Sequence, residues 1–312
     1  MGEDLRLAVV GLGGIAEKAY LPLLSSWPSL KLLACSRSPE TVANHLQRYP
    51  FQQGTIDLEE LIDWGPKAAL VLSPNPTHFE ITKKLLEGGV DTFVEKPLTM
   101  SSEASAELTA IAQKRERVLM VAFNRRFAPV HQWVKKRWGD RPVRYALLEK
   151  HRPEPVHADL ETNYIDDVIH QVDLMRYFCG EAKPLSTQYT ERNGRQEGAY
   201  SSLSLASGGL AVIATSRAAG RWREHYEIHG DGVSVYVEAF EKARWIDQGG
   251  ERHYGVEEIG SWSSHLMIRG FEGELKHFFQ CIETRQRPRT SAEESARTQR
   301  LLEGLLQVAE RV

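Results

Sequence analysis

Apolar positions in the first part of the chain form short continuous runs that alternate with helical stretches. The runs are typical of buried parallel strands and occupy Leu5–Val10, Leu30–Cys35, Ala68–Leu72, Val90–Val94 and Val118–Phe123. The segments between them are predicted to be helices at residues 17–26, 39–49, 58–61, 79–87 and 101–115. Alternation of this kind predicts a Rossmann domain with a doubly wound parallel sheet, ending near residue 124.

The pattern changes in the second part of the chain, where consecutive strands follow one another. After a helix at 129–138 and a strand at 143–150, we expect strands at 185–190, 199–206, 210–216, 223–229, 234–238 and 243–246. Asn193-Gly194, Ser207-Gly208-Gly209 and Asp231-Gly232 are turn signals between them. Residues 125–312 are thus predicted to form an α/β domain on an open, mostly antiparallel sheet. Helices are expected at 270–283 and 291–311, the last packing back on the first domain.

Composition and charge narrow the classes of protein. The 312-residue chain is long enough for two domains, and a net charge of −3 disfavours a nucleic-acid partner. No apolar stretch is long enough for a membrane span, and Glu3 and Asp4 near the start are not typical of a signal peptide. The cysteines are odd in number and far apart (Cys35, Cys179 and Cys281). We therefore expect a cytoplasmic protein with free thiols and no metal site.

A glycine-rich turn follows the first strand with the spacing G-x-G-x-x-A. Gly11 permits a tight turn, and Gly13 lets the backbone approach a pyrophosphate because it has no Cβ. Gly14 and Ile15 lead to Ala16, whose small side chain keeps the next helix close to the strand. The start of that helix offers free N–H groups to phosphates. Strand, glycine turn and helix together indicate dinucleotide binding. The alternative is a glycine turn in another kind of α/β protein.

Two further loops follow predicted strands, at the edge of the sheet where ligands bind in doubly wound folds. The second strand runs into Ser36 and Arg37, where NAD sites usually keep a carboxylate for the ribose 2′-hydroxyl. This favours NADP over NAD, unless Arg37 is only a solvated surface charge. The strand ending at residue 72 leads into a loop with Ser73, Asn75 and His78, which we expect to hold the cofactor or line its pocket.

A charged pair ends the apolar strand Val90–Val94. Glu95 and Lys96 precede Pro97, and a residue before proline is kept away from helical geometry. The side chain of Lys96 is therefore expected to leave the strand end at a fixed angle. The pair indicates a functional position, although both side chains could simply pair with neighbouring loops.

Three polar residues in the second domain share one face of a predicted helix. Asp166, His170 and Asp173 have the spacing i, i+4, i+7, and a carboxylate one turn from a histidine can orient the ring and stabilise its charged form. Asp167 points about 100° away from Asp166, so we expect another role for it. On spacing alone, an ordinary capped helix explains the pattern better than a catalytic site does.

In order along the chain, four motifs resemble those of the Gfo/Idh/MocA family of oxidoreductases. They are Gly11–Ala16, Ser73-Pro74-Asn75 with His78, Glu95-Lys96-Pro97, and Phe123–Phe127. Further shared segments are similar to those of the MviM subgroup, among them Lys150-His151-Arg152 and Arg269-Gly270-Phe271. The resemblance implies an NAD(P)-dependent enzyme that oxidises or reduces sugars, cyclitols and similar polyols. It also implies a homodimer or higher homo-oligomer through the open sheet.

The same resemblance implies a catalytic group. Lys96, Asp166 and His170 match the family's catalytic positions, with His170 as general base, Lys96 bonded to the reacting oxygen and Asp166 orienting the pair. Glu95 and Lys96 also belong to the implied cofactor site. Two other functions occur on this fold and stay open, a glycoside hydrolase that uses NAD transiently and a nucleotide-sensing regulator without catalysis.

One departure from the family and one charge cluster concern the substrate. Many members carry glycines before the first aspartate, whereas this chain has Glu161–Tyr164, so the resemblance does not give the substrate. Basic residues near the expected cleft are candidates for a phosphate or carboxylate of the substrate, namely Arg125, Arg126, Lys150 and Arg152. Ion pairs with nearby carboxylates are the favoured alternative.

Overall fold

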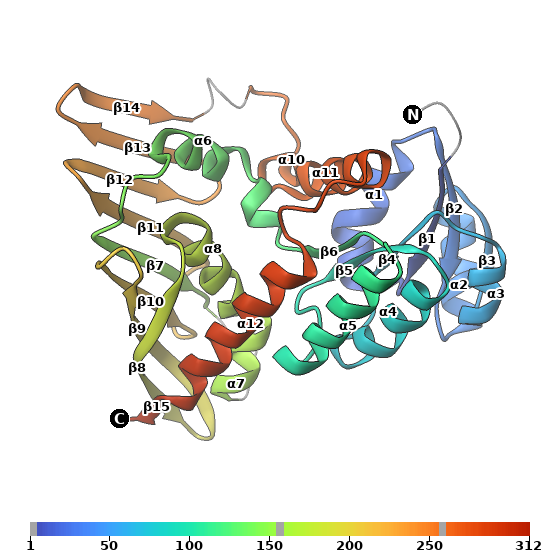
Figure 1. Ribbon diagram of the computed structural model, residues 1–312, viewed down its shortest axis with the longest axis horizontal. Helices are drawn as coiled ribbons and strands as arrows, with labels where there is room; N and C mark the ends of the chain where they lie inside the picture. Colours follow the sequence, from blue (N-terminus) through green and yellow to red (C-terminus); the bar gives the residue numbers. More distant parts are fainter. Residues whose placement is uncertain (1–4, 154–158, 256–259) are drawn as a thin grey trace. The chain divides into compact units, whose positions relative to one another are not determined.

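The computed structural model describes residues 5–153, 159–255 and 260–312 (Figure 1), so Glu3 and Asp4 lie outside the described residues. Contacts between residues divide the chain into two compact units. The first unit joins the chain up to Phe123 with Glu274–Ala296, and the second joins Asn124–Gly273 with Arg297–Val312. Each unit is built on a sheet of its own.

Over the described residues, the first unit has a six-stranded sheet in which all neighbouring strands are parallel. The order is β3-β2-β1-β4-β5-β6, so the winding reverses at β1. The strands are β1 (Leu5–Val10), β2 (Leu30–Cys35), β3 (Phe51–Thr55), β4 (Ala68–Val71), β5 (Asp91–Glu95) and β6 (Leu119–Ala122). The predicted doubly wound sheet is confirmed, and β1 and β2 have the predicted bounds.

Helices follow the strands of this sheet as the pattern predicts. They are α2 (Pro39–Arg48), α3 (Leu58–Asp63), η2 (Asn75–Thr77), α4 (His78–Glu87) and α5 (Ser102–Lys114). Ser101 is the N-cap of α5, and its hydroxyl accepts a hydrogen bond from the backbone N–H of Ala104 at 3.2 Å. The helix predicted at 17–26 differs, because it consists of a π-helical turn, η1 (Ala16–Tyr20), and α1 (Leu21–Ser25).

One strand of the first sheet, β3, was not predicted from the sequence. It lies at the edge beside β2, and Phe51 is its one buried residue. Gln52, Gln53 and Gly54 are exposed and interrupt any apolar run. An edge strand pairs on one side only and can be polar, so the local pattern does not reveal it.

The second unit contains, in the described part of the chain, a nine-stranded sheet of order β14-β13-β12-β11-β7-β10-β9-β8-β15. Two pairs, β7 with β10 and β8 with β15, are parallel, and the others are antiparallel. The strands are β7 (Tyr145–His151), β8 (Ala182–Arg192), β9 (Arg195–Leu205), β10 (Leu210–Ser216), β11 (Arg223–Gly230), β12 (Val233–Glu238), β13 (Lys242–Asp247), β14 (Gly250–Tyr254) and β15 (Ala309–Arg311). The mostly antiparallel sheet is thus confirmed.

The predicted glycine turns join these strands. Asn193 and Gly194 both have positive φ, as do Asp231 and Gly232, which is the backbone conformation of a tight two-residue hairpin turn. At the C-terminus the prediction was wrong. The last helix, α12 (Ala292–Gln307), ends four residues earlier than expected, and β15 follows it. Residues 309–311 pair with β8, and these backbone hydrogen bonds decide their conformation.

Helices cover one face of the second sheet (Figure 1). The helices of this unit are η3 (Asn124–Phe127), α6 (Pro129–Trp138), α7 (Leu160–Asn163), η4 (Tyr164–Val168), α8 (Ile169–Cys179) and α10 (His265–Ile268), while α11 (Phe271–Thr284) and α12 contribute residues to both units. α8 packs against β7 and β10, and α6 packs against β13. Alternate residues of β7, β10 and β11 are buried, and those between them are partly exposed.

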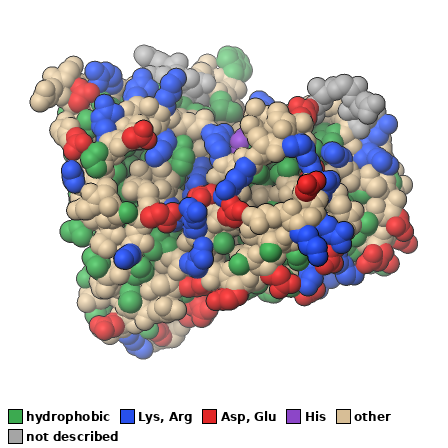
Figure 2. All heavy atoms as spheres, in the orientation of Figure 1, with side chains coloured by type: hydrophobic (Ala, Val, Ile, Leu, Met, Phe, Trp, Pro, Cys, Tyr) green, Lys and Arg blue, Asp and Glu red, His purple; other side chains and the backbone are tan. Residues whose placement is uncertain are grey.

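The surface carries charges of both signs. On the face drawn in Figure 2, acidic and basic side chains of the described residues are interspersed. In the same part of the chain, no helix combines the length and the apolar composition that crossing a bilayer requires.

Candidate active site

The loop after β1 requires glycine at its first position. Gly11 has φ +95°, a conformation that other residues rarely adopt, and its N–H donates to the carbonyl oxygen of Cys35 at 2.9 Å. A Cβ on Gly11 would lie 2.5 Å from the backbone nitrogen of Ser73, in the loop after β4. Gly11 therefore lets the loops after β1, β2 and β4 come together.

Gly13 and Gly14 have a different reason to lack a side chain. A Cβ at either position would meet no protein atom within 4 Å. Both are exposed on the wall of a cavity of about 830 Å³ at the carboxyl ends of β1, β2 and β4. Free space in front of a glycine backbone suits the close approach of a pyrophosphate. Ala16, the last residue of the motif, is fully buried.

The cavity gathers most of the residues predicted for cofactor binding. Its lining includes Gly11, Gly13, Gly14, Ile15, Ser36, Arg37 and Ser73. Arg37 is exposed, and Ser36 is fixed by a hydrogen bond from its N–H to the carbonyl oxygen of Thr55 at 3.3 Å. Burial, and after it the charge of Asp57, raises the pKa of the neighbouring Cys35 to about 11, so this thiol is uncharged at neutral pH. The end of β2 therefore presents a guanidinium and a hydroxyl to the cavity.

His78 lies outside the described lining of this cavity and joins two loops. It is fully buried at the start of α4. Its Nδ1 lies 2.7 Å from the carbonyl oxygen of Pro97, and its Nε2 lies 2.8 Å from that of Ser73. The ring thus holds the loop after β4 beside the loop after β5. Asn75 is partly exposed in the same loop, within η2.

Glu95 and Lys96 lie at the end of β5. Glu95 is 9% exposed, and its Oε2 accepts a hydrogen bond from the backbone N–H of Lys96 at 2.9 Å. Lys96 is half-buried, and its peptide bond to Pro97 is cis. Through His78, this loop is connected to Ser73 at the cavity wall.

In the second unit, Asp166 and His170 lie at the junction of η4 and α8, and both are half-buried. η4 is a π-helical turn, so the regular α-helical spacing assumed from the sequence does not apply up to Val168. π-helical turns are rare and occur frequently at functional sites. The chain has one at Asp166 and another, η1, directly after the glycine turn.

Asp167 is buried and anchors this π-helical turn. Its Oδ1 lies 2.5 Å from Nζ of Lys150, and Arg152 bonds both carboxylate oxygens at 2.6 and 2.8 Å. Arg217 contributes a third cation at 3.2 Å. Burial raises the pKa of Asp167, but Lys150 and Arg152 outweigh it and hold the pKa well below its usual range. These contacts give Asp167 three cationic partners inside the second unit.

A second buried carboxylate continues this cluster. Glu224 on β11 binds Arg125 through two hydrogen bonds at 2.9 and 2.5 Å, and it accepts the hydroxyl hydrogen of Tyr226. Its distance to Nζ of Lys150 is 3.7 Å. Burial, and after it the charge of Arg125, lowers the pKa of Lys150 to about 7. The cluster is therefore a structural network packed beneath the segment that carries Asp166 and His170.

The four basic residues considered for an anionic substrate all form ion pairs within the second unit. Arg126 binds Asp173 through two hydrogen bonds at 2.7 and 2.8 Å, and the other three bind Asp167 or Glu224. Asp173, the third residue of the predicted helix face, thus has a structural partner. These contacts favour the ion-pair alternative over binding of a substrate anion.

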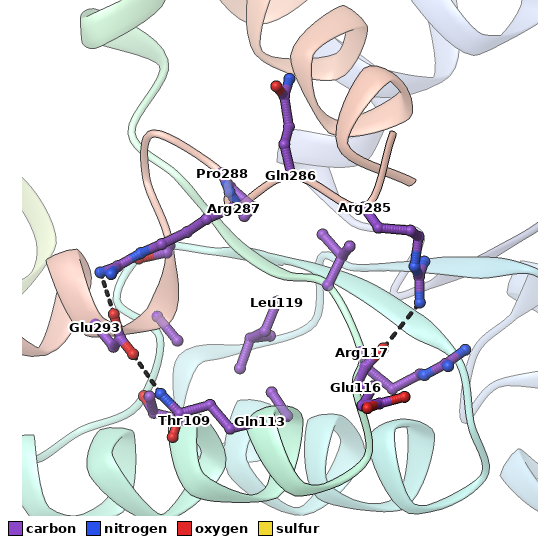
Figure 3. A pocket seen from close by; sticks show the side chains of 14 residues that line it. Thr109, Gln113, Glu116, Arg117, Leu119, Arg285, Gln286, Arg287, Pro288 and Glu293 are labelled. Atoms are coloured by element: carbon purple, nitrogen blue, oxygen red, sulfur yellow. Dashed lines mark hydrogen bonds and ion pairs between the residues drawn. The ribbon is translucent and has the colours of Figure 1, made fainter. Parts of the chain in front are cut away.

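A second cavity of about 570 Å³ lies at the opposite end of the first sheet, at the start of β6 (Figure 3). Several of its charged side chains have partners. Arg285 donates to Asp91 and to the carbonyl oxygen of Glu116, and Glu293 pairs with Arg287 and Gln113. No predicted site residue belongs to its described lining. Among the described residues there is also no group of three or more potential metal ligands.

Several buried groups near the predicted site residues were not found from the sequence. They are Tyr20, Glu224 and Glu274, all at most 1% exposed. Tyr20 and Glu274 are 254 positions apart, and their side chains meet at 3.0 Å. Within the sequence, Tyr20 was only one more residue of a predicted helix, so no local signal could have identified it.

Family models match both parts of the chain. A model described as "Oxidoreductase family, NAD-binding Rossmann fold" matches residues 5–123, and one described as "Oxidoreductase family, C-terminal alpha/beta domain" matches residues 164–311. Both models are those of the Gfo/Idh/MocA oxidoreductases.

Individual relatives span almost the full chain. YceM of Salmonella typhimurium, an oxidoreductase by name, is 32% identical over 97% of both chains. The scyllo-inositol 2-dehydrogenase (NAD(+)) of Bacillus subtilis is 26% identical over 92% of this chain and 89% of its own. The crystal structure of the dehydrogenase MviM from Clostridium difficile is similar with a TM-score of 0.89 at 25% identity, covering 98% of this chain and 99% of that one.

Proposed function

Because the chain belongs to the Gfo/Idh/MocA family of oxidoreductases, we propose that it transfers a hydride between a nicotinamide cofactor and a secondary alcohol or ketone of a sugar or cyclitol. The observation that carries the proposal is the glycine-walled cavity at the carboxyl ends of β1, β2 and β4. The space in front of Gly13 and Gly14 fits a dinucleotide pyrophosphate, and Arg37 and Ser36 lie where its adenosine ribose belongs in this fold.

The substrate class is supported by a relative. The Bacillus subtilis protein is named for its action on scyllo-inositol, a cyclitol, and the alignment spans nearly all of both chains. We extend this class, a polyol with secondary hydroxyl groups, to the present chain.

In the proposed mechanism the cofactor supplies hydride acceptor or donor chemistry, and the protein moves the proton. His170 removes the hydroxyl proton as general base, since a neutral imidazole nitrogen can accept it. Lys96 donates a hydrogen bond to the reacting oxygen and stabilises the negative charge that develops there. Asp166, four residues before His170, orients the ring. The carboxylate of Glu95 holds the backbone N–H of Lys96, and the ring of His78 holds the carbonyl oxygen of Pro97.

We further propose that NADP is preferred. Ser36 replaces the carboxylate that would repel a 2′-phosphate, and the exposed guanidinium of Arg37 can bind one.

A substrate screen tests the activity. Purified protein is incubated with sugars, cyclitols and their phosphates, and reduced nicotinamide is followed by its absorbance with NADP and NAD in parallel. We expect turnover of at least one secondary alcohol with consumption of the cofactor in stoichiometric amounts. Turnover of a glycoside with no net cofactor consumption would instead identify the NAD-dependent hydrolase.

A further inference from the structure

The hydroxyl group of Tyr20 lies between two buried glutamates of the first unit. Its oxygen is 2.8 Å from Oε1 of Glu95 and 3.0 Å from Oε1 of Glu274. Tyr20 and Glu274 are fully buried and Glu95 is 9% exposed. The three residues come from η1, β5 and α11, so the fold and not the local sequence brings them together.

The number of hydrogens limits how these contacts can form. A phenol has one hydrogen to donate, and an ionised carboxylate can only accept. Burial, followed by the charges of Glu274 and Glu95, raises the pKa of Tyr20 well above its usual value, so the hydroxyl keeps its proton. It can donate to one glutamate, and the other contact becomes a hydrogen bond only if that second glutamate carries a proton. With both contacts formed as hydrogen bonds, the two carboxyl groups hold one proton between them.

Geometry indicates which glutamate is neutral. Oε2 of Glu95 accepts a hydrogen bond from the backbone N–H of Lys96 at 2.9 Å, as an ionised carboxylate does. Glu95 also precedes a lysine in the chain, and a nearby positive charge favours the ionised form. Glu274 is fully buried, whereas Glu95 is 9% exposed. Burial favours the neutral acid over the carboxylate.

We propose that neutral Glu274 and Tyr20 form a directed hydrogen-bond chain to ionised Glu95, and that this chain positions the Glu95-Lys96 turn for catalysis. Glu274 donates to the oxygen of Tyr20, Tyr20 donates to Glu95, and Glu95 holds the backbone of Lys96. Tyr20 and Glu274 are thus positioning residues that act through Glu95. The inference rests on the role given to Lys96 in the proposed function, because only then does the chain affect turnover.

A spectroscopic experiment tests the shared proton without any substrate. The infrared spectrum of the purified wild type at neutral pH should contain the carbonyl stretching band of a protonated carboxyl group, shifted in ²H₂O. Glu274→Gln should remove this band, whereas Glu107→Gln, which changes an exposed carboxylate of the same unit, should keep it. Absence of the band from the wild type, or its persistence in Glu274→Gln, would overturn the inference.

A kinetic experiment tests the positioning role with the substrate found by the screen. Tyr20→Phe and Glu274→Ala should each lower kcat at least about tenfold while the KM for the cofactor stays within about twofold, because a displaced lysine loses its orientation. Glu274→Gln should restore kcat to near that of the wild type, since its amide N–H donates to Tyr20 as the acid does. Unchanged kcat in Tyr20→Phe, or a Glu274→Gln variant as slow as Glu274→Ala, would contradict the role.

The two proposals can fail separately. If Lys96→Ala kept wild-type turnover, the proposed function of Lys96 would be wrong, and the infrared band would still report the shared proton. If the band is absent while Lys96→Ala is inactive, the proton chain alone is wrong. Thermal unfolding followed by circular dichroism shows that each variant is folded under the assay conditions.

Discussion

At the scale of single residues, two kinds of surroundings occur among the predicted site residues. The glycines and Ser36 and Arg37 border open space in the cavity, whereas Glu95 and His78 are buried and hold backbone groups of neighbouring loops. Residues of the first kind can contact a cofactor directly. Those of the second kind fix the loop that carries Lys96, so substitutions at the two kinds should have different effects on binding and turnover.

Lys96→Ala and His170→Ala should each lower kcat by about 10²-fold or more, because each removes a group used in the transition state. The affinity for reduced cofactor, measured by fluorescence titration, should change much less. Lys83→Ala is the control for Lys96→Ala, because Lys83 is a surface lysine of the first unit. His253→Ala is the control for His170→Ala, because His253 is a surface histidine of the second unit. Near-native turnover in either test variant would disprove the assigned role.

Cofactor preference depends on Ser36 and Arg37. One charge-assisted hydrogen bond from Arg37 to a 2′-phosphate contributes roughly 1.5–3 kcal/mol, and tenfold discrimination requires about 1.4 kcal/mol. NADPH should therefore bind at least about tenfold more tightly than NADH. The double variant Ser36→Asp with Arg37→Ala should reverse the order. Titration of both cofactors into the wild type decides the matter, and equal or tighter binding of NADH would reject the preference.

At the scale of elements, two π-helical turns stand at the proposed functional segments, η1 after the glycine turn and η4 at Asp166. Each is tied to its own unit by a buried residue. Tyr20 at the end of η1 binds Glu95 and Glu274, and Asp167 in η4 binds three cations. Since irregular helical turns need such support from their surroundings, we expect these anchors to matter for stability.

Asp167→Asn should destabilise the protein by about 3–5 kcal/mol, because it leaves the buried Lys150 and its neighbouring arginines without their carboxylate. Urea unfolding at pH 7, followed by circular dichroism, measures the loss. The control Asp231→Asn removes an exposed carboxylate 3.9 Å from Arg144 and should change stability by less than about 1 kcal/mol. Equal stability of the two variants would show that the cluster does not anchor η4.

At the scale of the whole molecule, the second sheet leaves a face on which apolar side chains are exposed. Tyr145, Tyr200 and Leu210 are 40%, 43% and 54% exposed, and they lie on the neighbouring strands β7, β9 and β10. Tyr145 and Leu210 are paired in register. An exposed apolar sheet face suits a subunit interface, and a homo-oligomer through this sheet stays our prediction.

Sedimentation velocity tests this prediction at micromolar concentration. The wild type should sediment as a dimer or larger oligomer, and Leu210→Arg should shift it toward the monomer, because a buried unpaired charge opposes association. Leu46→Arg is the control, since it changes an exposed leucine of α2 in the first unit. A monomeric wild type, or equal association of both variants, would contradict an interface at this sheet.

Much of the fold follows from patterns within short stretches of the sequence. Continuous apolar runs gave β1 and β2 their bounds, because the burial of a strand is visible in residues close together in the chain. The tight turn at Gly11, which has a positive φ, also follows from the local sequence. The division into domains near residue 124 and the packing of the last helix stay predictions.

The tertiary structure alone decided the features that depend on distant neighbours. β3 and β15 are polar edge strands that exist because a partner strand supplies their hydrogen bonds. The contacts of the Tyr20 hydroxyl also join distant positions, because Glu274 is 254 residues from Tyr20 and Glu95 is 75 residues from it. Sequence periodicity reports which face of an element is buried and not what it is buried against, so the groups that hold Lys96 and Asp166 in place became visible only in the folded molecule.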